Sequence, residues 1–210
     1  MKGLFAPEGS LGRIETALLR GIEKFAECLP GDNSLPRKAL MKVAARDMMI
    51  YGRRLRLLPK YFGLASSELG EWERYYKSPA INGGVVMDVG AGCGETAVFF
   101  LHWGASKVIA IESDHYAFEM LERNMRQFGS SVETFEHKFS LDDLKRERDL
   151  VKIDIEGDEV ILLDYCGKLG ACIIESHERI HNGITSKLIE KFQLKALARF
   201  TNGTAIVSSN

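Results

Sequence analysis

Glycines and acidic residues are the groups in this sequence whose spacing could support chemistry. Gly90, Gly92 and Gly94 follow a short apolar run at residues 85–89, and a helical pattern begins at residue 97. Glycine adopts backbone angles that a Cβ forbids, and it leaves room for a ligand against the main chain. A strand, a glycine turn and a helix N-terminus together form a cradle for nucleotide-like ligands.

Polar side chains also end the later apolar runs of the sequence. They are Glu112, Ser140, Asp142, Asp154, Glu156, Glu175 and His177. Ligands of parallel sheets bind at the carboxyl ends of the strands. We therefore expect these side chains and the glycine turn to meet in one crevice.

Alternating strand and helix patterns after residue 84 position these groups. Apolar, β-branched runs predict strands at residues 85–89, 107–112, 131–138, 149–157 and 171–177. Helical patterns lie between them at 97–103, 116–128, 159–165 and 185–192, with a helical turn at 140–144. Residues 194–200 and 204–208 predict a closing hairpin that adds an antiparallel strand at the sheet edge. The expected fold is a mostly parallel, twisted sheet with helices on both faces.

Residues 1–80 predict a mostly helical extension that packs on a domain formed by residues 81–210. Helices are expected at 10–29, from residue 34 to the break at Leu58–Pro59, and at 68–77. Tyr75 and Tyr76 are expected to pack against the sheet, although they could also form a lid. The second helix would carry Lys38, Lys42, Arg46, Arg53, Arg54 and Arg56. A solvated face is the favoured interpretation of this stripe, and a surface for RNA is the alternative.

Composition excludes several classes of protein. The 210 residues carry a formal net charge of −1, so the chain as a whole is not attracted to nucleic acid or anionic lipid. No apolar run approaches the roughly 18 residues of a membrane helix, so no membrane partner is expected. The cysteines Cys28, Cys93, Cys166 and Cys172 lack metal-binding spacing. They indicate reduced thiols in a cytoplasmic protein.

The glycine turn favours S-adenosylmethionine (SAM) over a dinucleotide. Glu112 lies 22 positions after Gly90, close to the roughly 20 residues that separate such a turn from an acid that binds ribose hydroxyls. Glu95 stands where a dinucleotide site has a small residue. Its charge and that of Asp88 would repel a pyrophosphate and tolerate a cation. SAM has a ribose, a sulfonium, an ammonium and no phosphate.

Two segments resemble known methyltransferase motifs. Residues 88–96, DVGAGCGET, resemble motif I of Rossmann-like SAM methyltransferases, and residues 152–159, KIDIEGDE, resemble a signature of the FkbM family. Residues 104–112, 121–125 and 174–177 match in the same order, so the resemblance covers roughly residues 84–200. It implies a Rossmann-like class I methyltransferase domain. Cys93 departs from the family, which often has a larger or aliphatic residue there.

The resemblance also implies a set of cofactor-binding residues. They are Asp88, Gly90, Ala91, Gly92, Glu112, Ser113, Asp114, Ser140, Asp142 and Asp154. In this set Glu112 would bind the ribose, and Ser140 or Asp142 would lie where the adenine is contacted. Asp154 would lie beside the transferred methyl group.

Methyl transfer to a hydroxyl needs alignment of the reactants and removal of a proton. The candidate catalytic residues are Asp154, Glu156 and His177. A sulfonium would lower the pKa of Asp154, which favours a positioning role. His177 is the better base if its pKa is near neutral, but it could simply bond to backbone. Glu156 could equally cap the next helix.

His177 and His181 could bind a metal with Glu175 and Asp154, but the sequence does not require one and no metal is expected. The leading functional hypothesis is a SAM-dependent methyltransferase that methylates a hydroxyl of a small molecule or sugar, as a monomer or homodimer. The alternatives are an RNA methyltransferase and a non-catalytic module that binds SAM and scaffolds a partner.

Overall fold

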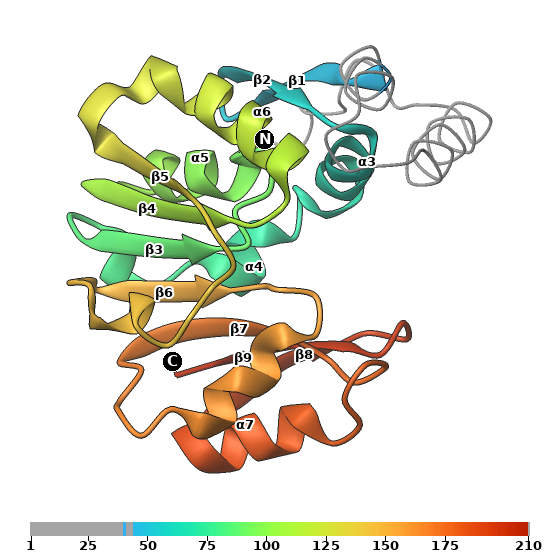
Figure 1. The fold of residues 1–210 in the computed structure, drawn as a ribbon, viewed down its shortest axis with the longest axis vertical. Coiled ribbons are helices and arrows are strands. Elements are labelled where there is room, and N and C mark those ends of the chain that lie inside the picture. The colour runs from blue at the N-terminus through green and yellow to red at the C-terminus, as the bar shows by residue number, and fades with distance from the viewer. Residues whose placement is uncertain (1–39, 41–43, 210) are drawn as a thin grey trace, which may run out of the picture.

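The computed structural model describes residue 40 and residues 44–209, which form a seven-stranded sheet with helices on both faces (Figure 1). In spatial order the strands are β5 (Val132–Glu136), β4 (Lys107–Glu112), β3 (Val85–Val89), β6 (Leu150–Ile153), β7 (Ala171–His177), β9 (Thr204–Ser208) and β8 (Lys195–Arg199). Strands β3 to β7 are parallel, and β9 pairs antiparallel with both β7 and β8. The predicted fold class is confirmed.

Burial on both faces explains the apolar runs of the central strands. Val86 packs into one core cluster, whereas its neighbours Met87 and Val89 pack into the other. Such strands lack a polar face because helices cover both sides of a parallel sheet. Val89 is the register partner of both Ile111 and Ile153. The residues that follow these three positions therefore lie at the same level of the sheet edge.

The helices that cover the sheet lie where the sequence predicts them, and those predicted at 116–128 and 140–144 are shorter than expected. The α-helices are α5 (Glu95–His102), α6 (His115–Met125) and α7 (Ile184–Phe192). The 3-10 helices are η2 (Arg126–Ser131), η3 (Asp143–Lys145) and η4 (Asp158–Asp164). The segment predicted as one helix over 116–128 is α-helical only to Met125 and continues as η2, in which Gly129 is non-helical with φ 56° and ψ −132°. The cluster containing Val86 faces α5 and α6, and the cluster containing Met87 faces η4 and α7.

Residues 46–57 form a hairpin, so the helix predicted there is wrong. Strands β1 (Arg46–Ile50) and β2 (Arg53–Leu57) are antiparallel. Tyr51 and Gly52 connect them with φ values of 46° and 77°. Two positive φ angles match the twist of a hairpin and are incompatible with a continuing helix. The predicted helix at 10–29, the start of the second helix, Lys38 and Lys42 lie outside the described residues.

The hairpin is followed by helices α3 (Pro59–Glu68) and α4 (Trp72–Tyr76) and the 3-10 helix η1 (Pro79–Ile81). The predicted break at Leu58–Pro59 is present between β2 and α3, and Pro59 begins α3 because proline is favoured in the first helical turn. Tyr76 is 4% exposed and its ring packs edge-on against Phe99 of α5, as expected. The hairpin, α3 and α4 thus share one hydrophobic core with α5 and α6. No helix in residues 44–209 has the length and apolarity needed to cross a membrane.

Candidate active site

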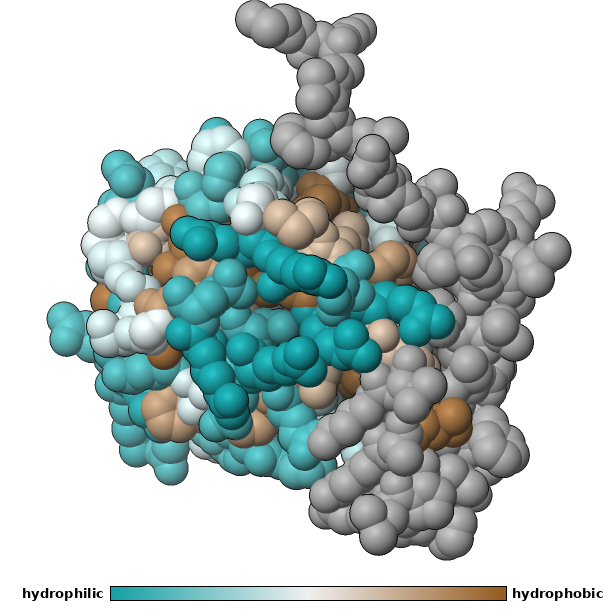
Figure 2. Space-filling model, turned by 90° about the horizontal axis from the view of Figure 1, so that it is seen from above, coloured by the Kyte–Doolittle hydropathy of each residue, from teal (hydrophilic) through white to brown (hydrophobic). Residues whose placement is uncertain are grey.

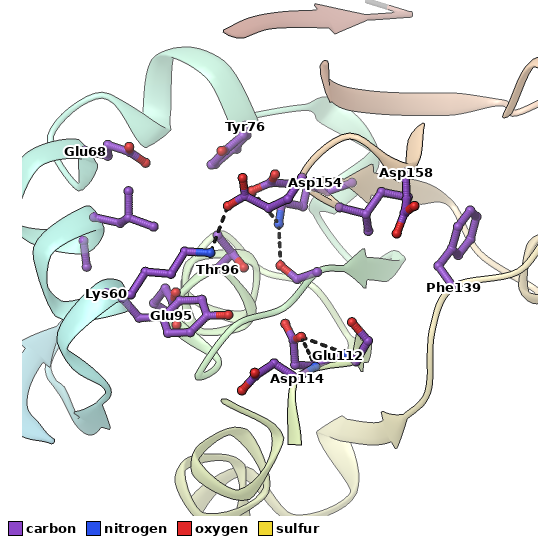
Figure 3. A pocket seen from close by; sticks show the side chains of 18 of the residues that line it. Lys60, Glu68, Tyr76, Glu95, Thr96, Glu112, Asp114, Phe139, Asp154 and Asp158 are labelled. Atoms are coloured by element: carbon purple, nitrogen blue, oxygen red, sulfur yellow. Dashed lines mark hydrogen bonds and ion pairs between the residues drawn. The ribbon is translucent and has the colours of Figure 1, made fainter. Parts of the chain in front are cut away.

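A cleft of about 220 Å³ opens at the carboxyl ends of β3, β4 and β6 (Figure 3). The register of these strands brings Gly90, residues 112–114 and residues 154–156 to its wall, as the sequence predicts. Helix α3 contributes Lys60 and Tyr61 from the opposite side. Lys60 Nζ lies 3.0 Å from Glu156 Oε1, so an ion pair links α3 to the end of β6 across the cleft.

The glycine turn has no backbone N–H group left to donate to a ligand. The N–H groups of residues 90 and 91 both donate to the carbonyl of Ile111. Those of residues 92 and 93 donate to the carboxylates of Glu112 and Glu95, each at 2.9 Å. The N–H of Gly94 donates to the carbonyl of Ala91. Phosphates at such turns are held by free N–H groups, so this turn does not suit a pyrophosphate.

The glycines are required by backbone shape and close packing. Gly90, Gly92 and Gly94 have φ values of 73°, 56° and 96°, which disfavour residues with a Cβ. A Cβ at Gly90 would lie 1.7 Å from the carbonyl oxygen of Asp154, and one at Gly92 would lie 2.6 Å from the ring of Tyr61. The space where these two Cβ atoms would lie is therefore filled by the protein, while Gly90 also lines the cleft.

Glu112 holds the turn and keeps one acceptor site. Its Oε1 accepts the N–H groups of Ser113 and Asp114, each at 2.7 Å, and its Oε2 accepts that of Gly92. A carboxylate offers about four lone-pair positions, so one remains for a hydroxyl in the cleft. Asp114 caps α6 by accepting the N–H of Ala117 at 2.8 Å.

Glu95 and Asp88, which were expected to give the site negative charge, contribute little negative charge to the cleft. Burial raises the pKa of Glu95 to about 8, so this carboxyl is mostly neutral at pH 7. Asp88 is fully buried, does not reach the cleft, and lies 3.3 Å from the ammonium of Lys152. Its other oxygen accepts from Thr96 Oγ1 at 2.6 Å. The absence of N–H donors, more than these charges, distinguishes the turn from a dinucleotide site.

Lys152 is a buried cation that the sequence analysis missed as a site residue. Its side chain is 2% exposed, donates to the carbonyl of Gly90 at 2.9 Å, and lies 3.8 Å from Asp154 Oδ2. Burial alone would lower the pKa of Lys152, but the charges of Asp88, Asp154 and Glu175 raise it. A lysine inside an otherwise apolar strand was the available signal, because such a charge needs buried partners.

His177 lies behind Asp154 and Glu156 and does not line the cleft. Its Nδ1 is 3.2 Å from Glu159 Oε1, and its Nε2 is 3.7 Å from Glu156 Oε2. Burial alone would lower the pKa of His177, but the hydrogen bond and charge of Glu159, with two further carboxylates, raise it to about 9. His177 therefore carries its proton at neutral pH, which disfavours the predicted role as general base.

Asp154 and Glu156 are the candidate catalytic residues that line the cleft, and Asp154 is the more buried of the two. Burial raises the pKa of Asp154, although the charges of Lys152 and His177 oppose the shift. Behind it, Glu175 accepts a hydrogen bond from Tyr76 Oη at 3.2 Å. Burial and the charge of Asp154 raise the pKa of Glu175 to about 8. Tyr76 and Glu68 line the cleft on this side; Glu68 was not anticipated there, whereas a lid was the alternative considered for Tyr76.

The remaining predicted residues lie elsewhere. Ser140 and Asp142 do not line the cleft; Asp142 is paired with Lys145 at 2.6 Å, while Lys138 and Phe139 occupy that part of the wall. Among the described residues, Asp154, Glu175 and His177 place one ligand atom each within 4.8 Å of one another, and His181 is not part of this group. Lys152 and protonated His177 already supply positive charge to these carboxylates.

The fold was compared with those of known proteins. TYW2 of M. jannaschii, solved in complex with AdoMet, superposes with a TM-score of 0.53 at 17% identity over 79% of this chain and 84% of that chain. The Escherichia coli protein YhhF superposes with a TM-score of 0.52 at 17% identity, over 78% of this chain and 97% of that chain. The tRNA m1G37 methyltransferase of M. jannaschii superposes with a TM-score of 0.50 at 15% identity, over 79% of this chain and 55% of that chain.

Neither a protein-family model nor a curated protein sequence matches this chain. At such identities the superpositions establish the fold alone. The described chain has the Rossmann-like fold that these proteins share.

Proposed function

We propose that this protein is a SAM-dependent methyltransferase. The observation that carries the proposal is the glycine turn whose five N–H groups are all used internally, beside a cleft rich in carboxylates. A ligand with hydroxyl groups and positive charge but no phosphate suits such a cleft. SAM is such a ligand, and the likeness to TYW2, which was solved with AdoMet, supports this choice.

The chain offers residues for each task of methyl transfer. SAM would supply a methyl group on a sulfonium. The free acceptor site of Glu112 would bind a ribose hydroxyl, and Asp114 lies beside it in the cleft wall. Asp154, whose pKa is raised, would accept the proton of an acceptor hydroxyl, with Glu156 as the second candidate. The segment 152–159 supports membership of the FkbM family within this proposal.

The leading acceptor is a hydroxyl of a small molecule or sugar. The acids and Tyr76 around Asp154 can accept and donate hydrogen bonds to such a group. RNA is the second acceptor class, favoured by the arginines of β2 and by the likeness to the tRNA m1G37 methyltransferase. Methylation of a hydroxyl is compatible with an RNA acceptor, because each RNA nucleotide carries a 2′-hydroxyl.

Calorimetric titration with SAM and S-adenosylhomocysteine tests cofactor binding. We expect Glu112→Ala to weaken SAM binding by about 1–3 kcal/mol, because a charge-assisted hydrogen bond is lost and the turn loses its anchor. Glu122→Ala, at an exposed position of α6 outside the cleft, is the matched control and should bind as the wild type does. Absence of binding by both ligands at high micromolar concentration would overturn the proposal.

Incubation of a cell extract with tritiated SAM then tests transfer and identifies the acceptor without a guess. Label should enter one fraction with the wild type and none with Asp154→Ala. SAM binding without labelling of any fraction would instead favour the non-catalytic scaffold.

A further inference from the structure

Arginines from three elements lie on one surface of the molecule. Arg53, Arg54 and Arg56 belong to β2, Arg123 belongs to α6, and Arg126 begins η2. We call these five residues the arginine face. Figure 2 looks onto the end of the molecule formed by the hairpin and α6, and shows a broad band of strongly hydrophilic residues there.

The arginine face is positively charged although the chain as a whole is not. Asp47 lies 2.6 Å from Arg54 and 3.4 Å from Arg56, and Glu122 lies 3.5 Å from Arg126, so these two acids offset part of the charge of the five guanidinium groups. The whole chain has a formal net charge of −1. Positive charge is therefore concentrated here, as on surfaces that bind phosphate backbones.

A hollow of about 390 Å³ lies within this face. Arg54, Arg56 and Arg123 line it together with Asp47, Asn124 and Gln127. Asn124 is 5% exposed. Its side chain accepts a hydrogen bond from the backbone N–H of Arg56 and donates one to the backbone carbonyl of Arg56, each at 2.9 Å. The hollow is thus held between two fixed elements, and several planar guanidinium groups can contact one phosphate.

An exposed apolar side chain interrupts the charged surface. Met49 is 60% exposed and is the register partner of Arg54. A thioether beside guanidinium groups can contact the face of an unpaired base while the arginines bind the adjoining phosphates. This combination suits an RNA with single-stranded bases better than a uniformly charged surface would.

The structure disfavours duplex DNA and lipid as partners. The inner side of the hairpin buries Ile50, Leu55 and Leu57 in the core, and Asn124 bonds the outer edge of β2. The ribbon is therefore not free to enter a major groove, which a two-stranded ribbon must do to read DNA. Met49 alone offers little apolar surface for insertion into a membrane.

We propose that the arginine face binds the phosphate backbone of an RNA. The inference rests on the proposed function, since it makes RNA the carrier of the methyl acceptor. The route to the cleft is short in the chain, because β2 continues directly into α3, whose Lys60 and Tyr61 line the cleft wall.

The test uses the full chain and a fluorescein-labelled RNA stem-loop with a single-stranded tail, measured by fluorescence anisotropy at several salt concentrations. The double variant Arg54→Glu/Arg123→Glu changes two exposed positions of the face. We expect RNA affinity to fall at least about tenfold, and the slope of log affinity against log salt to become shallower by about two.

The control variant is Lys187→Glu/Lys195→Glu, which makes the same charge change at exposed positions of α7 and β8, at the far end of the sheet. It should bind RNA as the wild type does. Equal losses in both variants would overturn the assignment to this face. Equal affinity for duplex DNA, or binding to phosphatidylserine-containing vesicles in place of RNA, would overturn RNA as the partner.

SAM titration of the same preparations separates this inference from the proposed function. If SAM binds to all three proteins and RNA to none, the arginine-face inference fails and the proposed function stands. If SAM does not bind to the wild type, the proposed function fails whatever the RNA result.

Discussion

Lys152 neutralises a carboxylate that water does not reach. Asp88 is fully buried, and Lys152 Nζ is 3.3 Å from it. We expect Lys152→Met to lower the free energy of unfolding by about 3–5 kcal/mol, because removing one partner of a buried ion pair leaves the other uncompensated. Chemical denaturation measures the change. The double variant Asp88→Asn/Lys152→Met should recover much of the loss.

Lys107 provides the matched control for this prediction. It pairs with Glu133 at 2.7 Å on the surface, where both side chains are partly exposed. Lys107→Met should cost no more than about 1 kcal/mol, as is usual for surface ion pairs. A cost for Lys152→Met as small as that for Lys107→Met would contradict the role given to the buried lysine.

At the scale of elements, the hairpin depends on its two-residue turn. Gly52 has φ 77° and open space where a Cβ would lie, so Gly52→Ala would introduce backbone strain without a clash. We expect it to destabilise the protein by about 1–2 kcal/mol, the usual cost of a left-handed conformation for a residue with a Cβ. Thermal and urea unfolding measure the effect.

Gly63 is the opposite case in the adjoining helix α3. It also has open space where a Cβ would lie, but its φ is not positive. Gly63→Ala should therefore stabilise the protein by about 0.5–1 kcal/mol. If both substitutions shift stability in the same direction, the conformation assigned to the Tyr51–Gly52 turn is wrong.

At the scale of the whole molecule, protons retained by the folded state make stability depend on pH. The pKa of His177 is raised from 6.5 to about 9, and those of Glu95 and Glu175 are raised from 4.5 to about 8. The folded state then binds more protons than the unfolded chain, so the free energy of unfolding falls as pH rises. His177 contributes its full stabilisation below about pH 6.5, and this stabilisation is lost as the pH rises through about 9. Glu95 and Glu175 contribute theirs fully below about pH 4.5 and lose it as the pH rises through about 8.

Urea unfolding between pH 7 and pH 9 measures this dependence. His177 alone should account for a decrease on the order of 2 kcal/mol over this range. His177→Gln should remove that part of the slope, whereas His181→Gln, at an exposed position outside the group around Asp154, should leave the slope unchanged. A wild-type curve that is flat or rises with pH would contradict the assigned protonation of His177.

The sheet could be predicted from the sequence because its strands are buried on both faces and its turns carry glycines. The hairpin at 46–57 could not be predicted, because arginines spaced for a helix concealed the alternation of buried and exposed residues along its two strands. The buried residues of this alternation are Met48, Ile50, Leu55 and Leu57. Glu112 and Asp154 were found because they directly follow apolar runs. Tyr61 and Glu68 were not found, because helix α3 of the preceding segment brings them to the cleft only through tertiary packing.

Asn124 joins two parts of the molecule that are far apart in the chain. Besides its two bonds to Arg56, its Nδ2 donates to the carbonyl of Cys93 in the glycine turn at 2.8 Å. Displacement of Asn124 with α6 would therefore free both the edge of β2 and that carbonyl. We therefore expect the amides of the hairpin edge and of the glycine turn to become exposed to hydrogen exchange together when Asn124 is displaced.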